Sequence, residues 1–482
     1  MVQSVFGVWD YAIMAATMVI SIVIGLYFRF SGGKQATNEE YLLADRNMSI
    51  LPVAVSLMAS FMSAITLLGV SAENYYYGMQ FVVINISYGV ATPIASRLYL
   101  PVFFGLQKTS TYEYLEMRFG PHIRMLASLT YTLQMVLYNG IVLYAPAIVL
   151  EAVTGLDRLI SILVVGLVCT FYSTLGGMKA VLFTDLLQSA LMFGAVFSVV
   201  VFASMQVGSF GQIFAIAKES GRLDFSNVDP TERHTWWSLI IGGLVTYLSL
   251  YAVNHTQVQR LQTVNTLERS QKCLWWSWPV LSVLSVVTCI SGLGIYAVYK
   301  DCDPFMSHSI SALMPYYVVD AMKDVPGLAG LFVAGIFSAS LSTISASCNA
   351  LAAVTLHDYV GRWCKVPASY VPWLTKLAAC GYGLVFLALA FIAEHLGGVL
   401  QAALTIFGAV GGPLLGIGFI WVIVVGTVIS LLWRQKQPWE RQGRSHPDPE
   451  LFTPPLANRL RARHEEKPAV QCKLLQSNGV QD

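Results

Sequence analysis

The residues best suited to chemistry in this 482-residue chain are hydroxyl-bearing side chains set inside apolar stretches. The segment 338–355 contains five serines and two threonines, and the segment SLMASFMSAITLLG at 56–69 has the same character. Small residues let helices pack closely in lipid, and a serine can also bond back to a carbonyl of its own helix. So dense a run, on a chain with few other polar groups in its apolar stretches, favours a polar path or an ion site.

Two further positions carry polar or charged groups into apolar surroundings. Asp185 lies a turn and a half past Lys179, at the start of an apolar stretch. An ionisable residue in a membrane helix is costly and indicates function by default, although an interfacial acid paired with Lys179 or a loop arginine is the alternative. The segment TYLSLYAVNHTQVQR at 246–260 brings in the polar residues Asn254, His255 and Gln257.

The elements that must position these residues are membrane-spanning helices. The chain is 55% apolar and only 12% charged, with a mean hydropathy of +0.60, whereas soluble domains carry about 25% charged residues. Its apolar residues form blocks near the ~20 residues that a helix needs to cross a bilayer. The sequence therefore predicts an all-α polytopic membrane protein. Eleven spans are expected, near 9–28, 50–71, 80–106, 125–150, 158–176, 182–206, 237–254, 274–299, 327–356, 372–393 and 397–433.

The basic residues alternate between the two sets of connections and predict the topology. One of these basic connections, after the seventh span, would hold Arg260, Arg269 and Lys272. Short loops rich in arginine and lysine remain in the cytosol, which places the N-terminus, residues 1–8, outside the cell. Residues 9–433 then form the transmembrane domain, and the polar, early-basic segment 434–482 reads as a disordered cytoplasmic tail.

Composition and motifs also exclude several function classes. A net charge of +2 gives no field for binding nucleic acid, and the eight cysteines lack the spacing of a zinc site or a disulfide framework. The chain contains no HExxH, GxSxG or P-loop motif, so we expect it not to be an enzyme.

The hydroxyl-rich segments that could unwind lie in the second and seventh expected spans, the first members of two successive five-helix sets. Broken helices in matching positions of two halves indicate a transporter built from inverted repeats, with its site near the middle of the membrane.

These segments also carry a family resemblance, which runs in order from about residue 9 to residue 416. The motifs are EYLLADRNMSILPVAVSLMASFMSAITLLGVSAENYYYG, PVFFGLQKTSTYEYLEMRFG, STLGGMKAVLFTDLLQ, VNHTQVQR and SLSTISASCNALAAVTLHDY. By these motifs the chain resembles the sodium/solute symporter family, in the animal branch of multivitamin, monocarboxylate and iodide symporters. The resemblance implies the five-plus-five inverted-repeat fold of the leucine-transporter type, with one extra N-terminal helix and core repeats at about 50–206 and 237–433.

The resemblance implies a sodium site between the second and ninth spans. Backbone carbonyls of Ala59, Met62 and Ala339 and the hydroxyls of Ser342 and Thr343 would bind the ion. Neutral oxygens suit a monovalent ion that must leave again. Asp185 and Gln188 would lie on the route by which sodium leaves, rather than bind it directly.

The resemblance also implies a site for a small anionic solute beside the second span. Its lining would be aromatic rings with hydroxyl tips, which suit a ligand with an apolar part and a polar head. His255 stands where the family usually has glutamine; it could alter this pocket or add pH sensitivity, and a satisfied buried histidine is as good a reading. Apart from Arg97, we expect no arginine or lysine deep in a span. The lining residues would be Phe61, Ser63, Thr66, Tyr138, Tyr247 and Tyr251.

The expected function is sodium-coupled import of a small organic anion, of vitamin or monocarboxylate type, across the plasma membrane. One departure supports an alternative, because the resemblance breaks near 417 and the chain passes directly into a segment like the family's last helix. Residues 396–433 carry no charge, and we expect one long span here and the loss of two helices. The alternative is a truncated, non-transporting or regulatory isoform.

Overall fold

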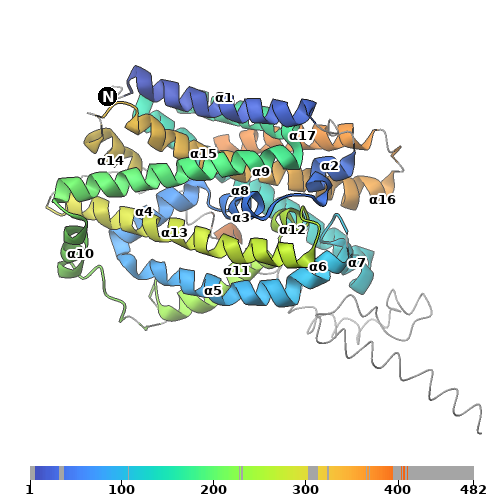
Figure 1. Ribbon diagram of the computed structural model, residues 1–482, viewed down its shortest axis with the longest axis horizontal. Helices are drawn as coiled ribbons and strands as arrows, with labels where there is room; N and C mark the ends of the chain where they lie inside the picture. Colours follow the sequence, from blue (N-terminus) through green and yellow to red (C-terminus); the bar gives the residue numbers. More distant parts are fainter. Residues whose placement is uncertain are drawn as a thin grey trace, which may run out of the picture.

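The computed structural model is helical throughout the part that it describes. It describes residues 6–31, 37–106, 108–226, 228–229, 232–301, 313–322, 325–364, 366–367, 370–393, 403, 405–407 and 410, and none of these forms a strand. The helices run along the long axis of the molecule (Figure 1). They are α1 Val8–Phe30, α2 Asn38–Leu43, α3 Ile50–Ala59, α4 Ala64–Tyr77, α5 Ile84–Ile94, α6 Leu100–Leu106, α7 Glu113–Phe119, α8 Pro121–Thr154, α9 Arg158–Val207, α10 Phe210–Glu219, α11 Gly243–Tyr247, α12 His255–Leu261, α13 Leu267–Tyr299, α14 Leu313–Ala321, α15 Leu328–Val354, α16 Gly361–Trp363 and α17 Val371–Ala393.

Long apolar helices account for most of the expected spans. Seven helical stretches of the described chain are long and apolar enough to cross a membrane, and two bent helix pairs would raise this to nine. The expected fifth span corresponds to a shorter apolar helix, Arg158–Phe171. Each of the first ten expected spans thus coincides with a helix. The eleventh, at 397–433, and the tail at 434–482 lie outside the described residues.

The fifth and sixth expected spans are the two arms of α9. They are joined at Gly177, whose φ of 59° and ψ of −173° interrupt the helical geometry. A positive φ is costly for residues with a Cβ, so glycine suits this break. The second arm, Gly177–Val207, is long enough to cross the membrane alone and carries Asp185 into the bundle.

The two bent pairs are the predicted broken helices. Helices α3 and α4 meet at an angle of 59° across residues 60–63, and the helical stretch Ser238–Ala252 meets α12 at 58° across residues 253–254. Asn254 begins α12, because its side-chain oxygen accepts a hydrogen bond from the amide of Thr256 at 2.9 Å. Similar breaks at matching positions of two halves are what an inverted repeat requires.

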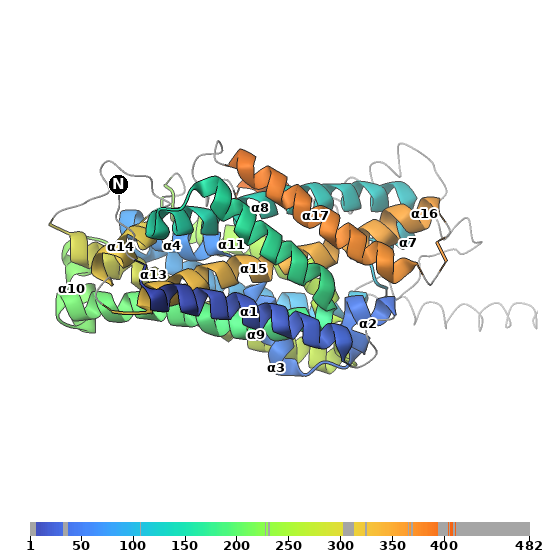
Figure 2. The ribbon, with the colours of Figure 1, turned by 90° about the horizontal axis from the view of Figure 1, so that it is seen from above.

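Helix α1 packs against α9 and α15 on the outside of the bundle (Figure 2). Asp10 is buried, and its Oδ1 accepts a hydrogen bond from the amide of Gly330, in the first turn of α15, at 2.7 Å. That amide has no partner within its own helix. A Cβ on Gly330 would lie 2.5 Å from the Asp10 Cα, so only glycine permits this approach.

Asp10→Ala is therefore expected to lower stability without changing sodium dependence. Loss of a carboxylate at a helix N-terminus costs about 1–2 kcal/mol. Thermal melting of the purified protein measures the change, and Asp10→Asn, which keeps an acceptor oxygen, is the matched control. Equal melting of Asp10→Ala and the parent would show that this contact is not stabilising.

Candidate site at the broken helices

The break between α3 and α4 leaves backbone groups outside any helical hydrogen-bond ladder. Ser63 donates its amide to the carbonyl of Phe61 at 2.9 Å. Across the described residues, no donor reaches the carbonyls of Ala59 or Met62, the two predicted sodium ligands here. Free carbonyl oxygens at an interrupted helix are the kind of ligand that sodium takes.

The three other predicted sodium ligands lie on successive turns of α15, and all are buried. The Thr343 hydroxyl donates to the carbonyl of Ala339 at 3.1 Å, within its own helix. Ser342 instead donates across the bundle to Asp185 Oδ1 at 2.6 Å. The alternative, in which a hydroxyl bonds back to a carbonyl of its own helix, therefore holds for Thr343 and not for Ser342. Their assignment as sodium ligands stays a prediction.

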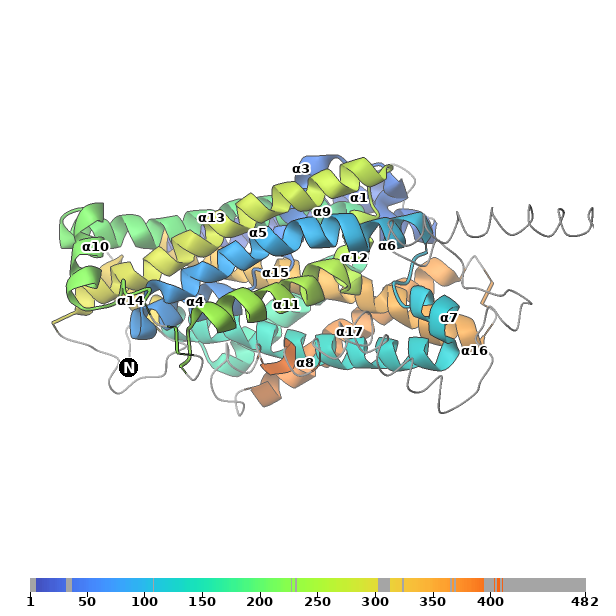
Figure 3. The ribbon, with the colours of Figure 1, turned by 90° about the horizontal axis from the view of Figure 1, so that it is seen from below.

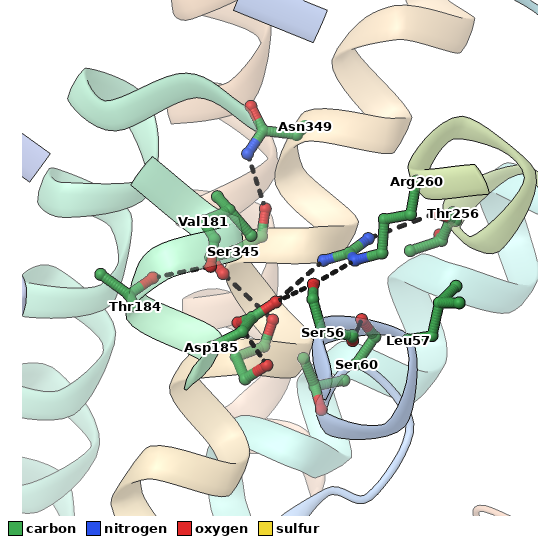
Figure 4. A network of polar contacts seen from close by, with 12 residues as sticks. Ser56, Leu57, Ser60, Val181, Thr184, Asp185, Thr256, Arg260, Ser345 and Asn349 are labelled. Carbon is green, nitrogen blue, oxygen red and sulfur yellow. Dashed lines mark hydrogen bonds and ion pairs between the residues drawn. The ribbon is translucent and has the colours of Figure 1, made fainter. Parts of the chain in front are cut away.

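Asp185 joins three elements that are far apart in the chain (Figure 4). It lies on α9, is fully buried, and accepts hydrogen bonds from Ser342 of α15 and Ser56 of α3. The carboxylate thus brings α15, which carries three of the predicted sodium ligands, and α3 of the broken pair to one point. Of the two alternative partners, Lys179 is not the one, because it pairs with Asp45 at 2.6 Å and with Glu40 at 3.4 Å. The other, an arginine expected in a loop, does pair with Asp185: it is Arg260.

Arg260 completes this network, and the sequence-based expectation for it is wrong. The pattern of basic residues predicts a loop position for it after the seventh span, yet it lies on α12 with a fully buried side chain. Its Nε donates to Ser56 Oγ at 2.8 Å, and its Nη2 lies 3.5 Å from Asp185 Oδ2. The sequence signal that could have revealed this helical position of Arg260 is Asn254, because asparagine often caps the start of a helix.

Gln188, predicted beside Asp185 on the sodium route, lies about one turn further along α9 and is also fully buried. Neither of its amide atoms has a hydrogen-bond partner among the described residues. The geometry thus leaves this amide available to an ion or to water near the carboxylate.

The predicted solute-binding residues form one connected cluster around the first break. Tyr138 of α8 donates its hydroxyl to Ser63 Oγ at 3.0 Å, and Ser63 lies 3.4 Å from the Thr66 hydroxyl. The Phe61 and Tyr251 rings are 6.0 Å apart, centroid to centroid. Tyr247 and Tyr251 stack at 4.4 Å. Among the described residues, the Tyr251 hydroxyl has no partner.

His255 stands apart from this cluster. Its Nδ1 lies 3.1 Å from the Thr111 hydroxyl, and its ring packs against Tyr112 and Tyr131. The reading of a satisfied buried histidine therefore holds for one ring nitrogen only, because Nε2 has no partner in the described chain.

Comparison with known proteins places this arrangement in a family. The model of the sodium:solute symporter family matches residues 41–430. A putative sodium-dependent multivitamin transporter of Drosophila melanogaster is 55% identical over 426 residues, which cover 86% of this chain and 70% of that one. Sodium-coupled monocarboxylate transporter 1 of Xenopus laevis is 44% identical over 438 residues, covering 89% and 70%.

Solved structures agree on the fold. A sodium-coupled sialic acid symporter in a substrate-bound, outward-open state superposes with a TM-score of 0.78 at 24% identity, covering 89% of this chain and 91% of its own. A transporter of the nucleobase-cation-symport-1 family superposes with a TM-score of 0.56 at 12% identity, covering 81% of each chain. With two broken helices facing α15 in a bundle of this fold, the chain belongs to the sodium:solute symporter family.

Proposed function

We propose that this chain imports a small organic anion, of vitamin or monocarboxylate type, into the cell together with sodium. Sodium is the ion that the family couples to solute movement. The observation that carries the proposal is the meeting of α3, α9, α12 and α15 at Ser56, Asp185, Arg260 and Ser342, beside carbonyls freed by a broken helix. The names of the relatives support the solute class.

Sodium would bind between the α3–α4 break and α15, held by the carbonyls of Ala59, Met62 and Ala339 and by the hydroxyls of Ser342 and Thr343. Asp185 touches Ser342 directly, so its charge attracts the ion without taking part in a full carboxylate cage. Arg260 shares that carboxylate and would hold it once sodium has left.

The solute would lie against the cluster of Tyr138, Ser63, Thr66 and the paired tyrosines. Among the described residues, no lysine or arginine forms a hydrogen bond or a cation–π contact with these side chains. A carboxylate would therefore be held by hydroxyl donors and by the positive end of α4, which begins at Ala64.

The proposed orientation follows from charge. Helices α2, α7 and α16 lie at one end of the bundle, opposite the N-terminus, α10 and α14 (Figure 1). The first end gathers basic residues in the connections between spans, in the short helices there and at the start of α13, and we propose that it faces the cytosol, at the plasma membrane. Those residues include Arg46, Lys108, Arg118, Arg269, Lys272 and Arg362.

The coupling is energetically sufficient. Each sodium ion entering a cell gains about 2.3 kcal/mol per 100 mV of inside-negative potential, before its concentration gradient is counted. A few ions can therefore drive accumulation of an anion against the same potential.

Uptake in cells that express this chain tests the function. The panel is radiolabelled pyruvate, biotin and iodide, each with sodium and with sodium replaced by choline, normalised to surface protein. Sodium-dependent uptake of pyruvate or biotin is expected. Surface protein without any sodium-dependent uptake would contradict the proposal and favour the non-transporting alternative.

Tyr138→Phe is expected to raise the KM for the solute about three- to tenfold, because it removes the hydroxyl that meets Ser63 and one hydrogen bond of about 0.5–1.5 kcal/mol. Half-saturation by sodium should change less. Tyr41→Phe is the matched control, since Tyr41 is buried and its hydroxyl bonds the carbonyl of Thr174 away from the cluster. An unchanged KM for Tyr138→Phe would remove Tyr138 from the pocket.

A further inference from the structure

Gln134 on α8 is a buried amide for which the described protein supplies no partner. Its side chain is 1% exposed, and neither Nε2 nor Oε1 meets a hydrogen-bonding atom of the described residues. Burying an amide without a partner is costly, and buried polar groups are nearly always satisfied. Something other than these residues must therefore complete the hydrogen bonds of Gln134.

Gln134 lies on the face of α8 that meets both helix breaks. Tyr131 and Tyr138 flank it at the helical spacing that puts side chains on one face. Tyr131 bonds the Thr256 hydroxyl at 2.8 Å, at the second break, and Tyr138 bonds Ser63 at 3.0 Å, at the first. Seven residues of helix, about 10 Å, separate these two contacts, and Gln134 lies between them.

His255 supplies a second unpartnered donor near Tyr131. The backbone amide of Thr111 donates to His255 Nδ1 at 3.4 Å. An N–H group can only donate, so Nδ1 holds a lone pair, and the neutral ring carries its proton on Nε2. That N–H has no acceptor among the described residues, and the His255 ring centroid lies 6.0 Å from that of Tyr131.

The segment Ser110–Tyr112 immediately precedes α7 and covers His255 from that end of the bundle. Figure 3 shows α7 beside the start of α8. All three of its residues are buried. Ser110 donates to Asp358 Oδ2 at 2.9 Å, and Arg124 of α8 bonds the same carboxylate, so these contacts hold the segment over His255 in this conformation.

We propose that Gln134 and His255 form a second anion-binding station, between the central pocket and the cytosolic end. A leaving anion would contact it once Ser110–Tyr112 has moved away. The amide and the ring offer N–H donors without a positive charge, which suit a carboxylate that must be held briefly and released. The inference rests on the proposed function, because it takes the same anion as its ligand.

Proteoliposomes containing the purified full chain test the station, with radiolabelled pyruvate as the first probe and biotin as the second. The KM is measured separately for anion on the external side, by uptake, and on the cytosolic side, by efflux. Gln134→Leu and His255→Phe are expected to raise the cytosolic KM about fivefold or more and to change the external KM less than twofold. His255→Gln keeps an N–H donor and should restore the cytosolic KM.

Asn139→Leu is the matched control, since Asn139 is a buried amide of α8 whose Nδ2 already bonds the carbonyl of Met135. Equal rises in both KM values for Gln134→Leu would assign Gln134 to the central pocket and overturn the station. No change in either would mean that water alone satisfies the amide, and would also overturn it.

A parent that moves neither probe would refute the proposed function, and a second readout then decides the station. Gln134→Cys is treated with a charged thiol reagent from the cytosolic side, with the parent as background. Slower modification in the presence of pyruvate supports the station. Modification at the same rate with and without pyruvate rejects it.

Discussion

Arg260→Leu is expected to remove most of the protein from the cell surface and to abolish the sodium-dependent uptake that remains. The side chain is fully buried and bonds Ser56, the carbonyl of Thr256 and Asp185. Removing one partner of a buried ion pair costs about 3–5 kcal/mol, because the other charge is left without compensation. That loss is a large fraction of the free energy of unfolding of a typical domain, about 5–15 kcal/mol.

The double variant Asp185→Asn with Arg260→Leu separates folding from transport. With both charges gone, no uncompensated ion remains, so the protein should return to the surface. Turnover should stay low, because the carboxylate near the proposed sodium site is missing. Surface biotinylation and uptake measure the two effects. Arg269→Leu, at an exposed arginine after α12, should resemble the parent. If Arg260→Leu alone reached the surface at the parental level, the buried pair would not be needed for folding.

Ser342→Ala combined with Thr343→Ala is expected to raise the sodium concentration for half-maximal uptake by tenfold or more. The change removes two proposed ligand oxygens, and each ligand interaction of about 1 kcal/mol corresponds to a severalfold loss of affinity. The measurement is uptake against sodium concentration, normalised to surface protein.

Ser347→Ala is the matched control on the same helix, because the Ser347 hydroxyl is buried and bonds the carbonyl of Thr343 within α15. It should leave sodium activation near the parental value. A double variant with unchanged sodium activation would exclude both hydroxyls from the site.

Much of the fold could be predicted from the sequence because insertion into lipid is a local property. About 20 apolar residues define a span wherever they occur, so ten helices could be placed from composition. The two breaks were predictable for a similar reason, since hydroxyl-rich segments and Asn254 alter the backbone within a few residues. The family and its sodium coupling could also be expected, because the motif around Asp185 and the motif around Ser342 are each an unbroken segment of the chain.

Only the tertiary structure decided which polar groups meet. Asp185 and Arg260 are 75 positions apart, and neither position alone shows that α9 and α12 face each other. The sequence pattern placed Arg260 in a loop, because an arginine after an apolar stretch usually marks the membrane boundary. A buried arginine is tolerated here because the packing supplies Ser56 and Asp185 to its N–H groups, and the carbonyl of Thr256 on its own helix accepts from a third. Such contacts depend on the shapes of several helices at once, and hydropathy along one chain segment does not encode them.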